Sequence, residues 1–393
     1  MIKKKKVALW TLGGILLISL FTLAYVVHIQ KDMSDFGVCY KNGQRIIRGE
    51  TLYRVSDGHL QFKYAPVSAL IYAPLALLPY ESAKIIWYVL ELCLLFAVFW
   101  ISYKLLPSRL KGPWFILGLS FLVLLKFIGR EIELGQVNIL IIFVLTMMLA
   151  TVVKKKDMTA GVLWGISLFV KPYALVFLPY FILKKRFKFI VTGLVILIAG
   201  LALPVLTFGF KGNLLVLKEW AFTLSKSTPG QIAAGDTASL YAFLWKILPG
   251  HPAFWTRILW LVIGLAVAVV FLWMIGEGRK RALKMPEILE AAFLMILIPL
   301  FSPLGWNYNY LYSVLAVVLV LNCWPKFPRL GKYVLAVDLI LIGATLQEVL
   351  GKTLFRFYTY NSLIVINFLI VLAALAYIRA AEVNSRYFKP KAI

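Results

Sequence analysis

The stretch PWFILGLSFLVLLKFIGREIELGQVNILIIFVLTMMLATVVKKK, residues 113–156, carries the pattern that decides the fold. Two apolar runs, about 113–129 and 136–153, flank a polar segment, and three lysines follow the second run. Each run is about long enough to cross the roughly 30 Å hydrocarbon core of a bilayer as a helix. Because that core offers no water to the backbone, a spanning segment must satisfy its own hydrogen bonds. The stretch therefore predicts two membrane-spanning helices joined by a polar turn.

Similar runs recur along the whole chain of 393 residues, of which 62% are hydrophobic and 15% are charged. We therefore predict an all-α, polytopic transmembrane helical bundle that forms a single domain over residues 1–393. No repeat of fixed period and no low-complexity linker divides the sequence. The other predicted full spans, which bring their number to about ten, are 7–29, 83–104, 189–208, 252–275, 287–301, 308–323, 332–350 and 362–378.

The cations of the chain, whose formal net charge is +25, gather in short segments between the runs. Loops rich in lysine and arginine normally stay on the cytoplasmic side of a membrane. This pattern puts both termini inside and makes an anionic phospholipid surface, rather than nucleic acid, the expected partner of the charges. The basic clusters are Lys3–Lys6, Lys154–Lys156, Lys184–Lys188 and Arg279–Lys284.

The segment 159–183 is long enough for one span, but it has basic residues on both sides. A single span would move two basic clusters to the outer face, against the usual charge pattern. We therefore favour a hairpin of two short helices that breaks near Lys171-Pro172, because proline interrupts a helix. The single span remains the alternative. Lys171 is interpreted as a lysine that extends from the break toward the membrane surface.

This topology puts two long loops, about 30–80 and 209–251, outside the cytoplasm, and long connections usually carry function. Asp32 and Asp35 lie three residues apart in the first loop, on one face if that part is helical. Each could act as a general base, or could be a solvated acid or a helix cap. The spacing is not that of an Asp-x-Asp metal pair, and no cysteine or histidine cluster has ligand spacing. We therefore predict neither a metal nor a cofactor.

Cations in the first outer loop run against the positive-inside pattern. Arg45, Arg48, Arg54 and Lys63 suit either a phosphate, to which arginine gives paired hydrogen bonds, or lipid headgroups. Arg130, at the outer end of its apolar run, suits either a phosphate or an ordinary interfacial ion pair. A phosphate-binding role for Arg130 and the nearby loop cations is the prediction that we carry forward.

Two polar stretches interrupt apolar runs at the same outer level. GREIELGQVNIL, residues 129–140, contributes Gln136 and Asn138, and polar groups at membrane depth are costly enough to mark sites. SPLGWNYNYLY, residues 302–312, contributes a tryptophan and two asparagines. Interfacial anchoring explains its aromatic residues. It does not explain the amides, which suit sugar hydroxyls, while an indole suits the face of a sugar ring.

In this order, the outer-face motifs resemble those of glycosyltransferase family 87, a family of polytopic GT-C type enzymes that includes polyprenol-phosphate-mannose-dependent α-mannosyltransferases. The similarity involves DFGVCY, GETLY, FKYAP, GQVNIL, AGVLWGISLFVKPYALVFLPYFILKKRFK and SPLGWNYNY, with a loose match at GDTASL. It implies that Asp35 is the general base, with Asp32 as the fallback. It also implies substrate binding by Lys63, Tyr64, Arg130, Gln136, Asn138, Trp306, Asn307 and Asn309.

The resemblance implies a multi-pass protein of the cytoplasmic membrane that moves a hexose from a polyprenyl-phosphate-sugar donor to a lipid or glycan acceptor outside the cell. A lipid-phosphate sugar has a good leaving group, so one base and groups that hold the phosphate are sufficient. Direct displacement with one base implies inversion. The chain departs from the mannosyltransferase branch, which tends to carry two histidines after the tryptophan. Here the residues are Asn307, Tyr308 and Asn309.

Two other classes remain open. A broken hairpin near Lys171 is also typical of lipid or solute transporters and flippases, although these often contain internal repeats, which this sequence lacks. A structural scaffold of the cell envelope is the third reading, and it would have no need of Asp35.

Overall fold

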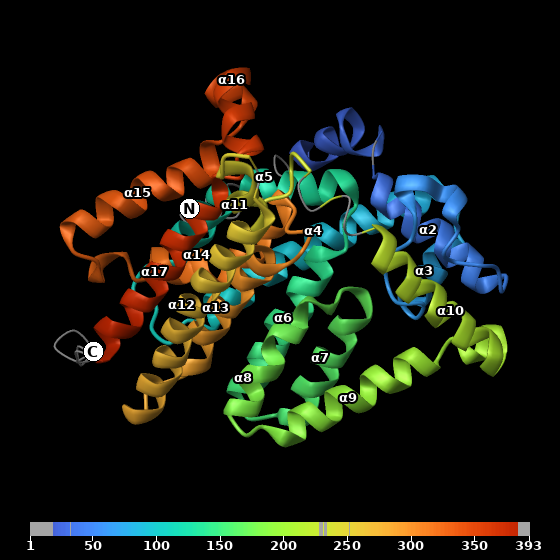
Figure 1. Cartoon of the computed structure of the whole chain (residues 1–393), viewed down its shortest axis with the longest axis horizontal. Helices are drawn as coiled ribbons and strands as arrows, with labels where there is room; N and C mark the ends of the chain where they lie inside the picture. Colours follow the sequence, from blue (N-terminus) through green and yellow to red (C-terminus); the bar gives the residue numbers. More distant parts are fainter. Residues whose placement is uncertain (1–18, 32, 228–230, 232–233, 251, 384–393) are drawn as a thin grey trace, which may run out of the picture.

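The computed structural model describes residues 19–31, 33–227, 231, 234–250 and 252–383. These residues form helices and no strand (Figure 1), which confirms the predicted all-α polytopic fold. The first elements are η1 Ile29–Lys31, α2 Ser34–Ile47, η2 Val55–Leu60, α3 Ser68–Ala76, α4 Tyr80–Lys104, α5 Pro113–Leu134, α6 Asn138–Val153, α7 Asp157–Val170, η3 Pro172–Val176 and α8 Phe177–Leu183. The others are α9 Phe187–Ala202, α10 Val205–Ser227, α11 Leu240–Ile247, α12 Ala253–Lys280, α13 Pro286–Phe301, η5 Asn307–Ser313, α14 Val314–Asn322, η6 Trp324–Lys326, α15 Arg329–Ala344, α16 Gln347–Tyr360 and α17 Ile364–Val383.

Fewer helices can span a membrane than the sequence predicted. Among the described residues α4, α12 and α17 are long and apolar enough alone, and there are up to six spans if three bent helix pairs count as one each. The pairs are α5 with α6, α9 with α10, and α15 with α16, bent by 120°, 92° and 97°. The prediction of about ten full spans is therefore corrected for the described residues, whereas most of the predicted span 7–29 lies outside them. Several apolar runs form short or broken helices, such as α14 with its nine residues.

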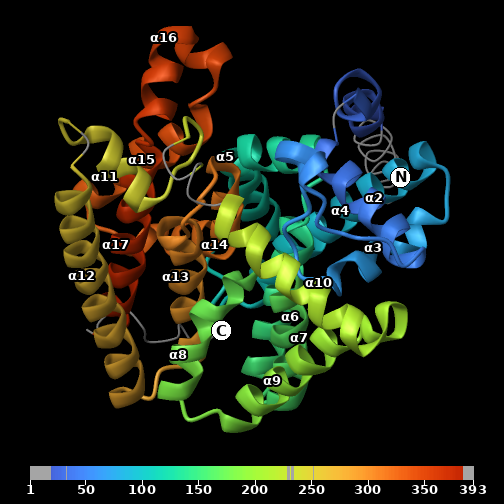
Figure 2. The same ribbon diagram turned by 45° about the vertical axis from the view of Figure 1, so that its right-hand side comes forward.

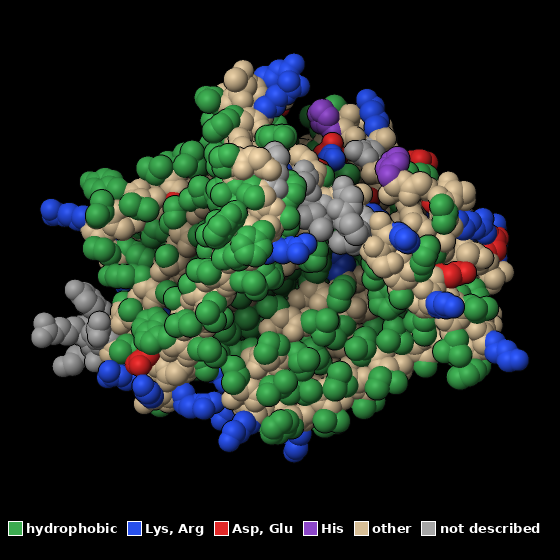
Figure 3. All heavy atoms as spheres, viewed as in Figure 1, with side chains coloured by type: hydrophobic (Ala, Val, Ile, Leu, Met, Phe, Trp, Pro, Cys, Tyr) green, Lys and Arg blue, Asp and Glu red, His purple; other side chains and the backbone are tan. Residues whose placement is uncertain are grey.

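The apolar surface of the bundle agrees with a lipid environment. Only 17% of the most apolar part of α12 is buried, so its side chains face outward. Figure 3 shows apolar side chains over most of one face, with lysines and arginines along its lower edge. All residues of α14 are buried, and the buried apolar side chains of the described residues form one contiguous cluster. The segment η5–α14 therefore lies at the centre of the bundle.

The predicted hairpin is confirmed. Helix α7 ends at Val170, Lys171 has extended backbone, and Pro172 begins the turn that leads into α8. The two ends of the hairpin meet, because Arg186 just after α8 forms an ion pair of 2.7 Å with Asp157 at the start of α7. The single-span alternative is therefore excluded.

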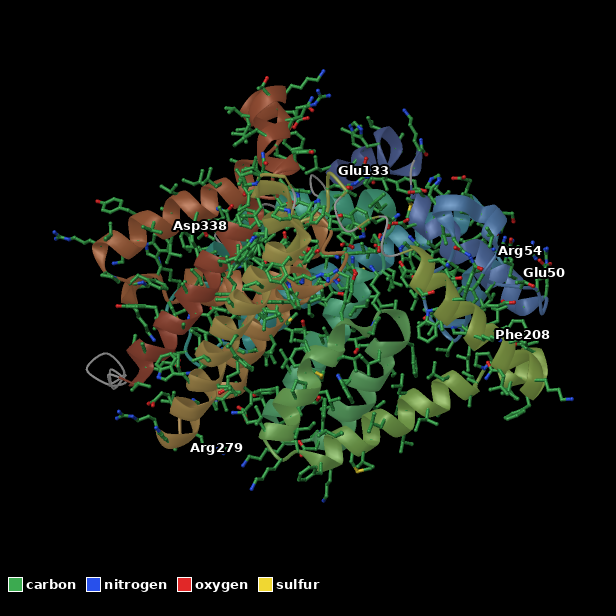
Figure 4. The ribbon with its side chains drawn as sticks, in the orientation of Figure 1. Glu50, Arg54, Glu133, Phe208, Arg279 and Asp338 are labelled. Atoms are coloured by element: carbon green, nitrogen blue, oxygen red, sulfur yellow. The ribbon has the colours of Figure 1, made fainter. Side chains whose placement is uncertain are left out.

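The basic segments after α6, α8 and α12 gather at one end of the molecule, which we call the basic end. Arg186 also pairs with Glu287 of α13 at 3.1 Å, and Arg279 of α12 donates to the Leu183 carbonyl. Figure 4 shows Arg279 at this end and Glu133 of α5 at the other. The common side predicted for these clusters is thus confirmed, whereas Lys3–Lys6 lie outside the described residues.

The two predicted outer loops are largely helical and touch each other. Residues 30–80 contain α2, η2 and α3, and Figure 2 shows α10 of the second loop passing beside them. The Trp220 indole of α10 donates to the Lys63 carbonyl at 3.0 Å. The description of 209–251 as a loop was wrong for its first half, because α10 continues through a bend at Gly209, whose φ is 67°.

Gly135 fixes the start of α2 against the turn between α5 and α6. It has a φ of 63°, which glycine adopts at little cost. A Cβ at this position would lie 2.6 Å from the Phe36 Cβ. The Met33 amide donates to the Glu133 carbonyl at 2.8 Å, and the Trp87 indole donates to the Gly135 carbonyl at 3.2 Å. These contacts set where Asp35, in the first turn of α2, can lie.

We expect Gly135→Ala to lower the free energy of unfolding by about 2–4 kcal/mol, since left-handed backbone and overpacking each cost about 1–3 kcal/mol. Thermal unfolding in detergent measures the change. Gly49→Ala is the matched control, because Gly49 has a φ of 66° but no atom within 4 Å of the added Cβ. Equal losses at both positions would contradict a tight contact between α2 and the α5–α6 turn.

Candidate active site

The site begins at the turn between α5 and α6. Glu131, in the last turn of α5, is fully buried, and its Oε1 accepts a hydrogen bond of 2.6 Å from the Asn138 amide at the start of α6. Gln136 lies between them in the chain and is 5% exposed. The short polar interruption of two apolar runs thus presents a carboxylate and two amides inside the protein.

Asp35 meets this turn from α2. The Gln136 side-chain amide donates to Asp35 Oδ2. The carboxylate is half-buried, in the first turn of α2, and the buried Cys39 and Ile46 follow it on the same side of the helix. A carboxylate held by an amide has a fixed direction, as a proton acceptor in a reaction requires. Asp32, the fallback candidate, lies outside the described residues.

Lys171 occupies the middle of the site. Its Nζ donates to Gln136 Oε1 at 3.1 Å and to Asn138 Oδ1 at 2.8 Å. The ammonium lies 5.7 Å from the ring centre of Tyr64 and 5.6 Å from that of Tyr173. The interpretation of Lys171 as a lysine that reaches toward the membrane surface was therefore wrong. The break in the hairpin turns Lys171 inward, and the side-chain amide of Gln136 connects it to Asp35.

The central segment η5 completes the network, which we call the Asp35 network. Asn309 Oδ1 accepts from Asn138 at 3.1 Å, and the Tyr312 hydroxyl donates to Asn138 Oδ1 at 3.3 Å. Asn309 is fully buried, so its amide lies inside the protein. Four segments far apart in the chain, namely α2, the α5–α6 turn, the hairpin tip and η5, therefore converge on Asn138 and Gln136.

Lys63 and Tyr64 border the network from the first outer loop. Burial lowers the pKa of Lys63, and the negative charge of Asp35 opposes that shift, so the two groups lie within electrostatic reach. Burial also raises the pKa of Tyr64. The Tyr53 hydroxyl fixes this part of the loop by donating a hydrogen bond of 2.6 Å to the Tyr64 carbonyl. Lys63 is thus a second cation beside Asp35.

The second outer loop reaches the same place. Thr237 forms an isolated backbone bridge with Trp306, and the Asn307 amide donates to the Asp236 carbonyl at 3.2 Å. Trp306 stacks on Tyr308 with ring centres 6.5 Å apart. Burial raises the pKa of Tyr308, with further contributions from Glu131 and Asp35. Tyr308 therefore lies within electrostatic reach of Glu131 and Asp35, and Trp306 stacks on its ring.

Asn307 differs from the other predicted residues in one respect. Its side-chain Oδ1 is buried and has no hydrogen-bond partner among the described residues. A buried acceptor without a partner is costly. This oxygen can therefore accept a hydrogen bond from a hydroxyl group.

The remaining predicted cations lie at the rim. Arg130 is half exposed and pairs with Glu133 one helix turn away at 2.8 Å. Arg54 pairs with Glu50 at 2.6 Å, and Figure 4 shows both at the edge of the molecule. The Arg45 guanidinium holds Asp57 through hydrogen bonds that lower the pKa of that carboxyl to about 2. Arg45 and Arg54 therefore stabilise the loop, whereas Arg130 pairs with Glu133 of its own helix.

Together the fold and the site define a polytopic membrane enzyme, with an oriented carboxylate, two neighbouring cations and a ring of amides and aromatic residues. The family model of glycosyltransferase family 87 matches residues 62–303, more than half of the chain. The chain belongs to this family and is a membrane glycosyltransferase. The matched segment contains Lys63, Gln136 and Lys171, and it begins after Asp35 and ends before Trp306.

Two mannosyltransferases of Mycobacterium tuberculosis are similar to the chain. One, of strain H37Rv, is a polyprenol-phosphate-mannose-dependent α-(1-2)-phosphatidylinositol mannoside mannosyltransferase, 23% identical over 343 residues, or 79% of this chain and 75% of the relative. The other, of strain CDC 1551, acts on phosphatidylinositol pentamannoside and is 22% identical over 265 residues, or 66% of this chain. The chain spans only 58% of that second relative.

Sequence reasoning missed four residues of the network, namely Glu131, Lys171, Tyr173 and Tyr312. Two of them carried a signal. Lys171 directly precedes a proline inside an apolar segment, where a charge is costly unless it faces the protein interior. Glu131 is the middle of three charged residues at a helix end. A search for ionisable residues at predicted helix breaks would have found both.

Proposed function

We propose that this protein transfers a hexose, mannose or a similar sugar, from a polyprenyl-phosphate donor to a lipid or glycan acceptor, with inversion and on the extracytoplasmic face. The printed names of both relatives support such a donor, and they support a phosphatidylinositol mannoside as one type of acceptor. The observation that carries the proposal is the chain of hydrogen bonds from Asp35 through Gln136 to Lys171.

In the proposed reaction Asp35 accepts the proton of the acceptor hydroxyl as its oxygen attacks the anomeric carbon. The bond from that carbon to the phosphate oxygen breaks, and the electron pair leaves with the polyprenyl phosphate. The proton stays on Asp35 until solvent removes it. Because the leaving phosphate needs no proton, a single carboxylate is sufficient. Gln136 fixes the direction of the carboxylate.

Charge on the leaving phosphate grows as the bond breaks, and cations beside it stabilise the transition state. Lys171 is linked to Asp35 through Gln136, and Lys63 interacts with the charge of Asp35. We therefore assign the donor phosphate to these two lysines, and to Arg130 as it approaches them. The Asn307 oxygen and the indole of Trp306 are suited to the sugar, one to a hydroxyl and the other to the ring face.

A transfer assay tests the proposal. The purified protein in lipid nanodiscs is incubated with radiolabelled polyprenyl-phosphate mannose, glucose or galactose and with extracted membrane lipids. We expect one sugar to move to a lipid or glycan product with inverted anomeric configuration, and the Asp35→Asn protein to form none above background. Movement of intact donor between leaflets without transfer would instead favour the transporter reading, which the broken hairpin still motivates.

Cysteine labelling tests the face of the membrane. In a Cys93→Ser background, which removes an exposed cysteine of α4, Ser56→Cys and Arg281→Cys each add one exposed thiol. We expect an impermeant maleimide to label position 56 in intact cells, and position 281 only after permeabilisation. The reverse result would place the Asp35 network in the cytoplasm.

A further inference from the structure

A cavity lies between α5 and α15, with α14 behind it. This α5–α15 groove has a volume of about 540 Å³, within the range of about 300–1,000 Å³ that is common for ligand sites. Its walls are apolar along nearly their whole length, for example Phe115 and Leu122 of α5 and Leu339 and Ile340 of α15. None of its lining residues belongs to the Asp35 network.

The groove follows the second half of α15, where its lining residues run from Ala336 to Ala344. One end is formed by Lys111 and Trp324, and the other by Leu346 and Val349 around the start of α16. From Ala336 to Ala344 the helix rises by about 12 Å. This is close to half of the roughly 30 Å hydrocarbon core, the depth of one leaflet. A single acyl chain, which reaches through one leaflet, therefore matches the groove in length.

A partly buried cation lies at the α16 end of the groove. Lys126 lies one turn beyond Leu122 on α5, and its Nζ donates to the hydroxyl of Thr345, between two lining residues of α15 and α16. The ammonium also lies 4.9 Å from the ring centre of Phe127 and 5.6 Å from that of Tyr358. In the described part of the chain, no Asp or Glu oxygen lies within 4 Å of it.

The nearest acid of α15 does not compensate this charge. Asp338 lies on a different side of the helix, where its Oδ1 accepts from Asn367 of α17 at 2.7 Å. A lysine at membrane depth without a carboxylate is costly, and an anion beside it removes that cost. The apolar walls exclude a free sugar or an inorganic anion as the main occupant of the groove, whereas they suit an alkyl chain.

From this juxtaposition we infer that the α5–α15 groove binds one acyl chain of an anionic phospholipid whose phosphate pairs with Lys126. The site is separate from the proposed sugar-transfer site and stands whether or not that proposal holds. The phosphate of the bound lipid neutralises the charge of Lys126, and its acyl chain fills the space between α5 and α15. It is therefore expected to stabilise the bent pair α15–α16 against the bundle.

Native mass spectrometry of the delipidated full-length protein tests the inference. We expect one dioleoylphosphatidylglycerol to bind at least about tenfold more tightly than dioleoylphosphatidylcholine. The choline cation already compensates the phosphate of the second lipid, whereas the phosphate of the first is left to form a charge-assisted pair with Lys126, worth about that factor or more. Lys126→Met should remove the preference, and Lys126→Arg should keep it. Lys284→Met, which removes one exposed cation of the α12–α13 turn, is the matched control and should change nothing.

A second variant tests the groove itself. Ala336→Phe, which adds volume to the wall, should weaken both phospholipids, while glycerol 3-phosphate alone should not compete with either. Equal binding of the two lipids, an unchanged preference in Lys126→Met, or full competition by glycerol 3-phosphate would each overturn the inference. If Lys126→Met does not fold, a phosphatidylglycerol with a photoreactive acyl chain decides the question. Crosslinks outside the lining of the groove would then overturn it.

Discussion

Asp35→Asn is expected to slow sugar transfer by about 10²- to 10⁴-fold, the usual cost of losing a general base. The substitution keeps the shape of the side chain and leaves an oxygen to accept from Gln136, so donor affinity and thermal stability should change little. Single-turnover rates with bound donor measure the chemical step, and equilibrium binding of the donor measures affinity separately. A loss of affinity with an unchanged rate would remove Asp35 from the chemistry.

Two other acids serve as controls. Asp57→Asn should lower stability by loosening Arg45 but leave the transfer rate close to that of the wild type. Asp32→Asn should cost far less than Asp35→Asn. If the Asp32→Asn protein is inactive and the Asp35→Asn protein has normal activity, the general base is Asp32 and not Asp35. Normal turnover in both would favour the transporter reading.

Lys171→Met is expected to lower the transfer rate by about 10²- to 10³-fold, the typical effect of removing one group that stabilises transition-state charge. It also leaves Gln136 and Asn138 without their donor, so stability should fall as well. Lys171→Arg keeps the charge but changes its shape, and it should recover part of the rate. Steady-state kinetics and thermal unfolding, measured on the same preparations, separate the two effects.

Lys188→Met, which removes an exposed cation near the basic end, is the matched control for charge and should leave the rate unchanged. Arg130→Ala should weaken donor binding by about ten- to a hundredfold if its guanidinium guides the phosphate into the site. A Lys171→Met protein that loses stability but keeps its full rate would make Lys171 a purely structural link between the hairpin and α6.

The helical fold, the hairpin and the meeting of Asp35, Gln136, Asn138 and Asn309 could be predicted from the sequence. Charge placement and apolar length are local properties, and each of these four side chains sits where an apolar run is interrupted. The motifs required no knowledge of packing, because segments that end at the same membrane level are brought close together by the bundle.

The direction of Lys171 and the number of spans could not be predicted in the same way. Hydropathy measures how apolar a segment is, but not whether it bends, and the apolar run 332–350 contains the 97° bend between α15 and α16. Lys171 turns inward because Gln136 and Asn138 accept from it. Those acceptors belong to a segment some 35 residues away, so only the tertiary structure sets the direction.

Lys171 lies at the tip of the hairpin, and the two ends of the hairpin, at Asp157 and Arg186, lie at the basic end of the molecule. Helix α7 has 14 residues and is about 21 Å long, and Arg186 ties its start to the end of α8 and to α13. Close-packed interiors transmit strain. We therefore expect the hairpin to move as one rigid unit, so that loosening the Arg186 ion pairs displaces Lys171 at the far end of α7. Loss of Arg186 should consequently slow sugar transfer, although Arg186 lies a whole helix length from the Asp35 network.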